Sequence, residues 1–317
     1  MSSVVLQVEN LTKRYGPVVA VNNLSLAVNE GEIFGFLGPN GAGKTTSINM
    51  LCGLLKPDAG RVLIHDQPIT NGATKVQTRV GVCPQNVVVW ERLTCLEQLQ
   101  FIGEMYGLPS TLARQRGRQL LEQLNLVEKR DQQAHTLSGG MRRRLSLALA
   151  LVHDPSIVVL DEPEAGLDPQ SRIQVREFIR SLARRKTIIL TTHNMDEAER
   201  VADRIAIIDH GELLVLDTPE MLKRSVGEGD VLEIALNGQP ENGGVQRACE
   251  ELQQLTPGVS LDAAHSALTV RALNVVNLLP AIMEVLAQSG LHCGEVRLRA
   301  NSLEDVFIQL TGRRLRE

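Results

Sequence analysis

The sequence predicts an α/β protein followed by a smaller α+β domain, and three observations lead to this prediction. The apolar run Ile33–Leu37 leads directly into a glycine-rich segment, Gly38–Thr45. A second apolar run, Ile157–Leu160, ends in two acidic residues. Continuous apolar runs of this length are typical of buried parallel strands, and binding loops gather at the carboxyl ends of such strands. Beyond residue 230, strand-like and helix-like patterns alternate in a separate unit.

The glycine-rich segment fits the pattern G-x-x-x-x-G-K-[ST], in which glycines let the backbone curl around a polyphosphate. Its amides would point inward at the N-terminus of a helix predicted over Thr46–Leu55. Lys44 would add a positive charge at the β- and γ-phosphates, and the Thr45 hydroxyl would coordinate Mg²⁺. An incidental glycine-rich turn is the alternative, and the preceding strand argues against it. The predicted nucleotide-binding residues here are Gly38, Pro39, Asn40, Gly41, Ala42, Gly43, Lys44, Thr45 and Thr46.

The acidic pair Asp161 and Glu162 ends the second apolar run. Asp161 is predicted to hold Mg²⁺ through water, and Glu162 to orient or deprotonate the water that attacks the phosphate. A strand that ends in an acidic turn is common by itself, so this interpretation depends on the phosphate-binding loop. Together the two segments predict a P-loop NTPase, an enzyme that hydrolyses a nucleoside triphosphate.

Five further segments, in order along residues 4–225, resemble those of the nucleotide-binding subunits of ATP-binding-cassette (ABC) transporters. They are Tyr15 at the aromatic A-loop, Gln85 at the Q-loop, Leu137–Met141 at the signature, Ala165–Asp168 at the D-loop and His193 at the switch. The resemblance implies ATP as the nucleotide, catalytic roles for Glu162, His193 and Lys44, and metal contacts from Thr45, Gln85 and Asp161. It also implies nucleotide contacts from Tyr15, Gln85, Ser138, Gly139, Gly140 and Asp168.

The signature segment supports the same interpretation from its own residues. Ser138, Gly139 and Gly140 precede a helix predicted over Met141–Val152, so a hydroxyl and open amides again lie at a helix N-terminus. One γ-phosphate cannot lie at both helix ends of one chain if the family geometry holds. The resemblance therefore implies a head-to-tail dimer in which Ser138 completes the site of the other subunit. For Ser138 alone, an ordinary helix cap is the alternative.

Two positions depart from the family pattern. Met141 replaces the usual Gln, and Glu164 with Ala165 replaces a more common Thr-Ser or Thr-Val pair. Glu164 adds a carboxylate close to Asp161, and like charges raise one another's pKa unless a cation offsets them. The departures leave a homodimer and pairing with a different ATPase chain both open.

Gln85 and His193 follow predicted strands over Arg79–Cys83 and Thr187–Thr192. If the sheet is parallel, the second of these strands lies beside the P-loop strand, and a neutral His193 imidazole could bond to the γ-phosphate. Helix capping near Asn194 is the alternative for the histidine. A plain surface amide is the alternative for Gln85.

Composition excludes several classes of protein. The chain has 317 residues, 43% of them hydrophobic, and a net charge of −4, which favour two well-packed domains over a broad nucleic-acid-binding surface. Arg142–Arg144 are expected to face solvent or the site. The five cysteines have no metal-binding spacing and are predicted to be reduced thiols. No apolar run of about eighteen residues occurs, and the amino terminus resembles a strand rather than a signal peptide. We therefore expect a cytoplasmic protein, attached to the membrane through a permease.

The first domain is predicted over residues 1–226. A small antiparallel sheet is expected within residues 4–37, ahead of the P-loop, and a helical insert at about 86–136. Two helices, Cys95–Tyr106 and Leu112–Leu124, make up most of this insert, which is the expected coupling element.

The second domain is predicted over residues 227–317, after the linker Gly227–Asp230. Its strands and helices follow the order βαββαβ, which is typical of a ferredoxin-like fold, with a terminal helix. The ending Leu303–Arg313 closely resembles the C-terminal domain of daunorubicin-resistance-type ATPases, which implies export of a hydrophobic compound, a lipid or a polysaccharide. The predicted elements are strand Val231–Leu236, helix Val245–Leu255, hairpin Val259–Ala272, helix Val275–Gln288, strand Gly294–Arg299 and helix Ser302–Leu310.

Three functions need to be compared. The favoured one is a motor subunit that dimerises around MgATP and drives export through a separate integral membrane permease, with no nucleic acid as partner. A soluble ATPase that acts on ribosomes or DNA ends would carry two cassettes or a long coiled-coil insert, and the sequence has neither. A regulatory module that binds ATP and a small ligand without transport is the third. Val87–Trp90 could line a groove for a cytoplasmic helix of the permease, or Trp90 could be ordinary core.

Overall fold

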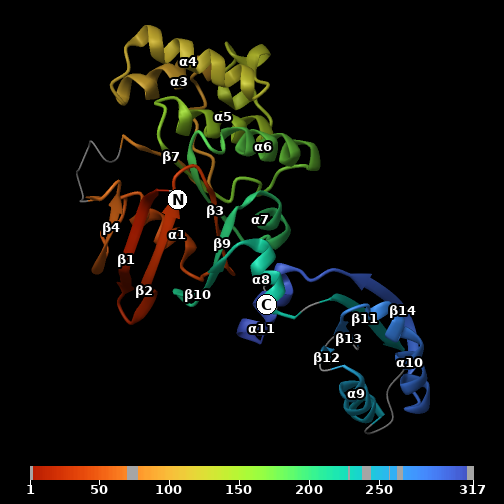
Figure 1. Ribbon diagram of the computed structural model, residues 1–317. Coiled ribbons are helices and arrows are strands. Elements are labelled where there is room, and N and C mark those ends of the chain that lie inside the picture. Colours follow the sequence, from red (N-terminus) through yellow and green to blue (C-terminus); the bar gives the residue numbers. More distant parts are fainter. Residues whose placement is uncertain are drawn as a thin grey trace. The chain divides into compact units, whose positions relative to one another are not determined.

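The computed structural model describes residues 3–69, 78–227, 229–237, 244–256, 258–262 and 267–312. The chain forms two compact units, Met1–Pro219 and Glu220–Leu315, whose helices and strands are labelled in Figure 1. The division falls at the start of helix α8 (Pro219–Ser225), whereas the sequence pattern predicts it after that helix.

A six-stranded sheet forms the centre of the first unit. Its strands are β3 (Ile33–Leu37), β6 (Val80–Cys83), β7 (Ile157–Asp161), β8 (Thr187–Thr192), β9 (Arg204–Asp209) and β10 (Glu212–Asp217). The order is β10-β9-β3-β8-β7-β6, and all neighbours are parallel except β10, which runs antiparallel to β9. Every residue of β3 and β7 is buried, as expected for parallel strands. The strand before His193 lies beside the P-loop strand, as predicted, because β8 pairs with β3.

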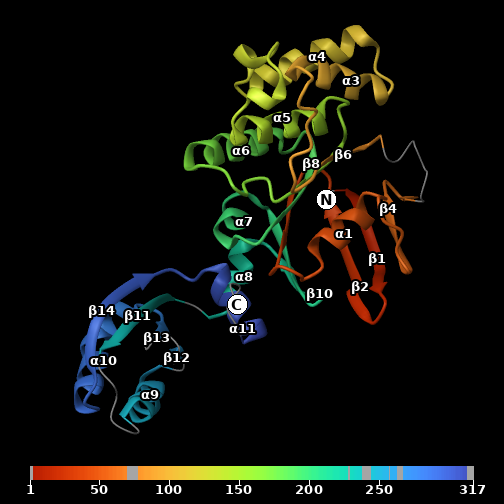
Figure 2. The ribbon, with the colours of Figure 1, turned by 180° about the vertical axis from the view of Figure 1, so that it is seen from behind.

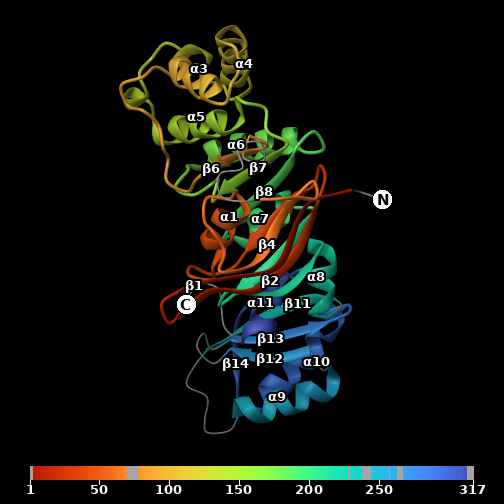
Figure 3. The same cartoon turned by 90° about the vertical axis from the view of Figure 1, so that its left-hand side faces the viewer.

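A second, antiparallel sheet lies in the same unit and is visible in Figure 3. Its strands are β1 (Val4–Tyr15), β2 (Val18–Asn29), β4 (Ala59–Ile64) and β5 (Gln67–Pro68), in the order β2-β1-β4-β5. The predicted hairpin ahead of the P-loop is confirmed. However, two of the four strands come from beyond the P-loop helix. Apolar residues from both sheets and that helix share one core, including Val8, Phe34, Ile48 and Ile64.

The helices of the first unit are α1 (Lys44–Leu51), α3 (Cys95–Met105), α4 (Ser110–Gln123), α5 (Gly139–Leu151), α6 (Pro169–Leu182) and α7 (Met195–Val201). Helix α1 starts two positions before the predicted Thr46 and stops before Leu55, because Gly53 turns the chain with a φ of 68°. The two predicted helices of the insert, α3 and α4, lie side by side next to α5 (Figure 2). Gly103 permits this close packing, since a Cβ there would lie 2.6 Å from the Cβ of Ala113.

The second unit has the predicted ferredoxin-like order of elements. After α8 come β11 (Asp230–Asn237), α9 (Gly244–Leu255), β12 (Gly258–Asp262), β13 (Ala267–Ala272), α10 (Val275–Gln288), β14 (His292–Arg299) and α11 (Leu303–Thr311). The four strands form an antiparallel sheet in the order β12-β13-β11-β14. Helices α9 and α10 contribute buried residues such as Leu252 and Ile282 to one core with the strands (Figure 3).

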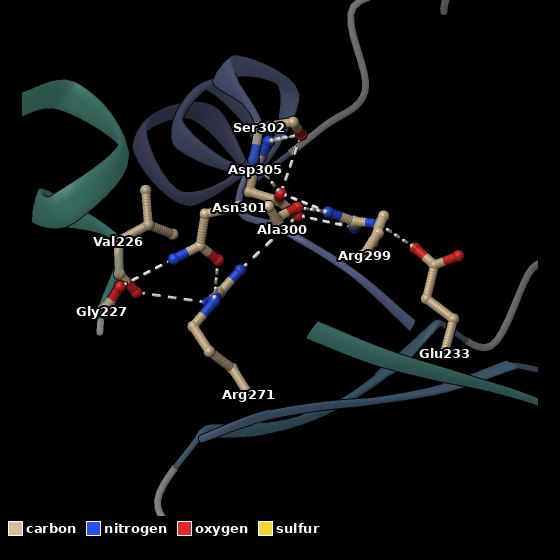
Figure 4. A network of polar contacts seen from close by, with 9 residues as sticks. All are labelled: Val226, Gly227, Glu233, Arg271, Arg299, Ala300, Asn301, Ser302 and Asp305. Carbon is tan, nitrogen blue, oxygen red and sulfur yellow. Dashed lines mark hydrogen bonds and ion pairs between the residues drawn. The ribbon is translucent and has the colours of Figure 1, made fainter. Parts of the chain in front are cut away.

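A network of polar side chains links the segment after α8 to this second core (Figure 4). Arg271 donates to the carbonyl oxygen of Val226, and Asn301 donates to that of Gly227, at 3.2 and 2.8 Å. Asp305 accepts two bonds from Arg299, at 2.6 and 2.9 Å. Burial alone would raise the pKa of Asp305, but hydrogen bonds from Arg299 and Ser302 hold it below its usual value. These bonds explain why α8 belongs with the second unit.

Candidate functional site

The P-loop connects β3 to α1 and requires glycine at two positions. A Cβ at Gly38 would lie 2.3 Å from the carbonyl oxygen of Ile208. Gly43 has a φ of 97°, and a Cβ there would lie 2.3 Å from the carbonyl oxygen of Ala20. Gly43 is also the N-cap of α1, and no side chain caps the helix. The first amides of α1 therefore lack intrahelical acceptors and are suited to bind an anion such as a phosphate.

Lys44 lies across this loop. Its Nζ donates to the carbonyl oxygens of Gly38 and Pro39, at 2.6 and 2.9 Å. Burial lowers the pKa of Lys44, and the nearby carboxylates of Glu162 and Asp161 act against this shift. The ammonium group is thus held between the loop and the acidic strand end, where a phosphate would need it. The neighbouring Thr45 is exposed, as a ligand for a metal on a bound nucleotide would be.

The two predicted carboxylates lie at the carboxyl end of β7, and both are less than a tenth exposed. Thr191, on the neighbouring strand β8, bonds to both residues. Its hydroxyl donates to Asp161 Oδ1 and accepts from the Glu162 amide at 3.1 Å. Glu162 itself has a φ of 47°, a backbone conformation that non-glycine residues adopt at a cost and that is found often at functional sites. Thr191 therefore positions the acidic pair, a role that the sequence analysis missed.

Glu162 brings together the predicted histidine and glutamine. His193 Nδ1 lies 2.8 Å from Glu162 Oε1, and Gln85 Nε2 lies 3.5 Å from Oε2. An ionised carboxylate only accepts hydrogen bonds, so Nδ1 carries the hydrogen and the other ring nitrogen, Nε2, is left for a ligand. The histidine side chain is 52% exposed, which makes that nitrogen accessible. The Glu162 carboxylate at the end of β7 thus contacts two residues that follow the neighbouring strands β6 and β8.

Arg143 and Arg144, on α5, are both buried. The segment Arg142–Arg144 was expected to face solvent or the site, and Arg143 packs against the site. Arg144 corrects that expectation, because its guanidinium donates to the carbonyl oxygen of Leu124 instead. The Arg143 guanidinium donates five hydrogen bonds, all to backbone carbonyl oxygens and all between 2.6 and 3.1 Å. The acceptors are Pro84, Gln85, Asp161, Glu162 and Pro163. One side chain therefore fixes both the Q-loop backbone and the acidic strand end.

The signature residues lie at the start of α5. Ser138 is the N-cap, and its Oγ accepts from the Met141 amide at 3.3 Å, so the ordinary cap is present. Ser138 and Gly139 are also exposed, and a Cβ at Gly139 would meet nothing within 4 Å. The segment thus offers an open helix N-terminus on the surface of the chain.

The D-loop residue Asp168 is likewise exposed and caps α6. Hydrogen bonds from the side chain and the amide of Ser171 lower its pKa. The additional acid Glu164 is buried, and Arg176 offsets its charge through two bonds, at 3.1 and 2.6 Å. The negative charge that Glu164 adds near Asp161 is therefore offset by Arg176 of the same chain. Tyr15 ends β1 with a half-exposed ring, and the Lys13 Nζ lies over this ring, 5.8 Å from its centroid.

A groove of about 380 Å³ lies beside the Q-loop. Trp90 lines it and is 41% exposed, with its ring edge-on to Phe101 at 5.6 Å. Trp90 therefore lines a groove and is not ordinary core, and the binding of a permease helix in this groove stays a prediction. Apolar side chains form much of the wall, among them Leu54, Val82, Val88, Trp90, Ile102 and Tyr106. No helix in the part of the chain that the structure describes is long and apolar enough to cross a membrane.

A phosphate-binding loop and an acidic strand end at the same edge of one parallel sheet define a P-loop nucleoside triphosphatase. The family model described as "ABC transporter" matches residues 21–165. Nod factor export ATP-binding protein I of Ralstonia nicotianae is 40% identical, with 100% of this chain and 96% of the relative covered. Daunorubicin resistance ATP-binding protein DrrA2 of Streptomyces coeruleorubidus is 37% identical, with 99% and 97% covered. The chain belongs to the ABC transporter family and is one of its exporter-type, ATP-hydrolysing subunits.

Solved structures agree on the fold. An ATP-binding subunit of an ABC transporter matches with a TM-score of 0.64 and 27% identity, over 70% of this chain and 92% of that chain. A dimeric ATP-binding cassette bound to ADP and Pi matches with a TM-score of 0.62 and 27% identity, over 67% and 98%. The predicted P-loop fold and nucleotide binding are confirmed. The roles of the individual site residues stay predictions.

Arg143→Lys is expected to slow ATP hydrolysis about ten-fold and to lower the free energy of unfolding by roughly 2–4 kcal/mol. A lysine has one compact donor group and cannot reach carbonyl groups on two loops at once. Phosphate release and urea unfolding would measure the two effects. Arg142→Lys, on the same helix but only half-buried, is the matched control. Equal behaviour of the two variants would contradict the role of Arg143.

Proposed function

We propose that this ATPase subunit closes with a second ATPase subunit, head to tail around two MgATP, and that closure drives export through a separate membrane permease. The observation that carries the proposal is the contrast between two helix N-termini. The P-loop of one chain has its lysine, acids, histidine and glutamine assembled around it. The signature N-terminus at Ser138 is exposed, and among the described residues its hydroxyl bonds to the Met141 amide of its own helix. A second copy supplies the missing contact.

Nucleotide binding is assigned to the residues around this loop. The amides at the start of α1 and the Lys44 ammonium would hold the β- and γ-phosphates, and the Tyr15 ring would stack on adenine. Ser138, Gly139 and Gly140 of the other subunit would contact the γ-phosphate. Asp168 would lie at the same interface.

Hydrolysis is assigned to the Glu162 carboxylate. It would accept a proton from a water whose oxygen attacks the γ-phosphorus, as the bond to the β-phosphate oxygen breaks and ADP and phosphate form. The hydrogen bond from His193 Nδ1 orients the carboxylate, and Nε2 of the same ring would face the γ-phosphate. Mg²⁺ held near Thr45, Asp161 and Gln85 would supply positive charge to the phosphate oxygens. Thr191 and Arg143 keep these groups in place.

Names of the relatives support the direction of transport. Besides the two relatives already described, linearmycin resistance ATP-binding protein LnrL of Bacillus subtilis is 34% identical over 98% of this chain and 100% of that protein. One of these three names states export, and the other two state resistance to a compound. We therefore propose export of a hydrophobic compound, a lipid or a polysaccharide, with the chain at the cytoplasmic face of the membrane, held there by the permease. The alternative of a purely regulatory ATP-binding module has no supporting feature of its own.

The Trp90 groove is the proposed contact with the permease. Much of its wall is apolar and includes Val88, which is 60% exposed, so an amphipathic helix of the permease could bury its apolar face there. The groove adjoins the Q-loop, whose Gln85 contacts Glu162. Movement of a permease helix in the groove would therefore be transmitted through the Q-loop to the Glu162 carboxylate.

Trp90→Glu is expected to remove the chain from membranes that contain its permease partner, and to leave basal ATP hydrolysis within about three-fold. A charge in the apolar groove opposes helix docking, while the catalytic carboxylate is untouched. Co-expression, membrane sedimentation and phosphate release would measure both effects. Val127→Glu is the control, because Val127 is 52% exposed and does not line the groove. Membrane binding by the Trp90 variant equal to that of this control would refute the docking site.

A further inference from the structure

Strand β14 forms one edge of the sheet in the second unit. Among the described strands it pairs with β11 alone, so the other side of its backbone has no strand partner. Its alternate residues Val296 and Leu298 are apolar and are 38% and 52% exposed. An exposed apolar edge strand without proline is a template for pairing with another strand.

The other face of β14 carries opposite charges. Glu295 and Arg297 are both more than 60% exposed and bond to each other through two contacts of 2.8 Å. Arg299, on the same face, is already engaged by Glu233 and Asp305 (Figure 4). Two opposite charges at positions i and i+2 of an edge strand are therefore available to a partner.

We infer that β14 pairs antiparallel with β14 of a second copy of this chain, about a twofold axis at Val296. In this register Glu295 lies opposite Arg297 of the other copy, and the pair occurs twice. Opposite charges and apolar groups directly across an antiparallel pair stabilise it. The two four-stranded sheets would join into one.

Charge selects this register over its neighbours. A twofold axis requires each antiparallel register to be centred on one residue. Centring on Glu295 places that carboxylate opposite itself, and centring on Arg297 places the guanidinium opposite itself. Like charges directly across a strand pair are destabilising. Val296 is the centre that avoids both clashes and makes two favourable pairs.

The contact adds to the ATP-closed dimer but does not depend on it. Exposed ion pairs and one strand edge give a weak association in free solution, since such pairs are screened by water and salt. When two cassettes are joined by MgATP, their C-terminal units are tethered at an effective concentration of about the millimolar range. The strand pairing would then prolong the lifetime of the dimer. Neither Ser138 nor the nucleotide takes part in it.

The test uses the full chain without nucleotide. Val296→Cys, in a background with Cys249→Ser and Cys293→Ser, places a thiol at the proposed axis. We expect it to form disulfide-linked dimers about ten-fold faster than Gln254→Cys in the same background. Gln254 is an exposed residue of α9, which packs on the opposite edge strand β12. Equal rates at the two positions would overturn the inference.

Charge reversal separates contacts between chains from the bond within one chain. In the Val296→Cys background, Glu295→Arg and Arg297→Glu are each expected to slow cross-linking about ten-fold. An equimolar mixture of these two variants should regain the rate, because opposite charges then meet only across chains. The double reversal should also cross-link at the original rate, which shows that both changes leave β14 folded. If the double reversal cross-links at the original rate and the mixture stays slow, the two charges act only within one chain and the inference is wrong. Gel filtration with MgATP tests the ATP-closed dimer separately.

Discussion

Glu162→Gln is expected to bind MgATP normally and to hydrolyse it at least ~100-fold more slowly, the lower range for loss of a positioned general base. The amide keeps the shape of the side chain and can still accept the hydrogen bond that His193 makes to Oε1. It removes the basic oxygen and one negative charge beside the γ-phosphate. The ATP-bound dimer should therefore accumulate, and gel filtration with MgATP should show a stable dimer for the variant. The parent should be mostly monomeric once its ATP is spent.

Glu164→Gln is the matched control for this experiment. Glu164 is also buried and close in sequence, but Arg176 holds both of its oxygens. We expect it to retain hydrolysis within about five-fold, because it does not face the site. Hydrolysis by Glu162→Gln at the parent rate would remove Glu162 as the base. Of the neighbouring acids, the exposed Asp168 would then be the carboxylate to examine.

Ser138→Arg is expected to leave ATP binding by isolated chains nearly intact and to abolish hydrolysis. The hydroxyl is exposed and does not bond to the P-loop of its own chain among the described residues, so the first subunit keeps its site. A bulky side chain at the proposed interface would exclude the γ-phosphate of the other subunit. Fluorescent nucleotide binding at low protein concentration and phosphate release at high concentration would separate the two effects.

Gln133→Arg is the control for the added charge, since Gln133 is exposed and lies just ahead of the signature. Loss of the Ser138 cap itself costs about 1 kcal/mol, too little to unfold the chain. Equal loss of nucleotide binding and hydrolysis in the monomeric variant would contradict the shared site. It would mean that Ser138 acts within its own chain.

The P-loop is an example of a feature that can be predicted from neighbouring residues in the sequence. The strand, the glycine spacing, Lys44 and the start of a helix are consecutive, so their conformations depend on neighbouring residues alone. The same holds for α10, where apolar spacing predicts the observed bounds Val275–Gln288. The ends of α1 were less accurate, because glycine at position 53 stops the helix after a turn that the apolar pattern alone does not mark.

Arg143 could not be assigned in the same way. It has a local signal, since Leu147 and Ala150 follow it at helical spacing on a buried face. Its guanidinium bonds to carbonyl oxygens of two segments that are distant in the sequence. Whether those segments meet α5 is a matter of long-range packing. Thr191 is a comparable case, because its contact with Asp161 exists only once β7 and β8 are paired.

By itself, the sequence determined the class of enzyme, the candidate phosphate and acid groups, and the order of elements in the second unit. Each of these features depends on the chemistry and the hydrophobic periodicity of residues that are close together in the sequence. The tertiary structure alone decided that β4 and β5 complete the antiparallel sheet of the first unit, that α8 belongs with the second unit, and that β14 is an edge strand. The reason is physical: strand neighbours and buried polar partners depend on contacts between residues far apart in the chain, and no local preference specifies them.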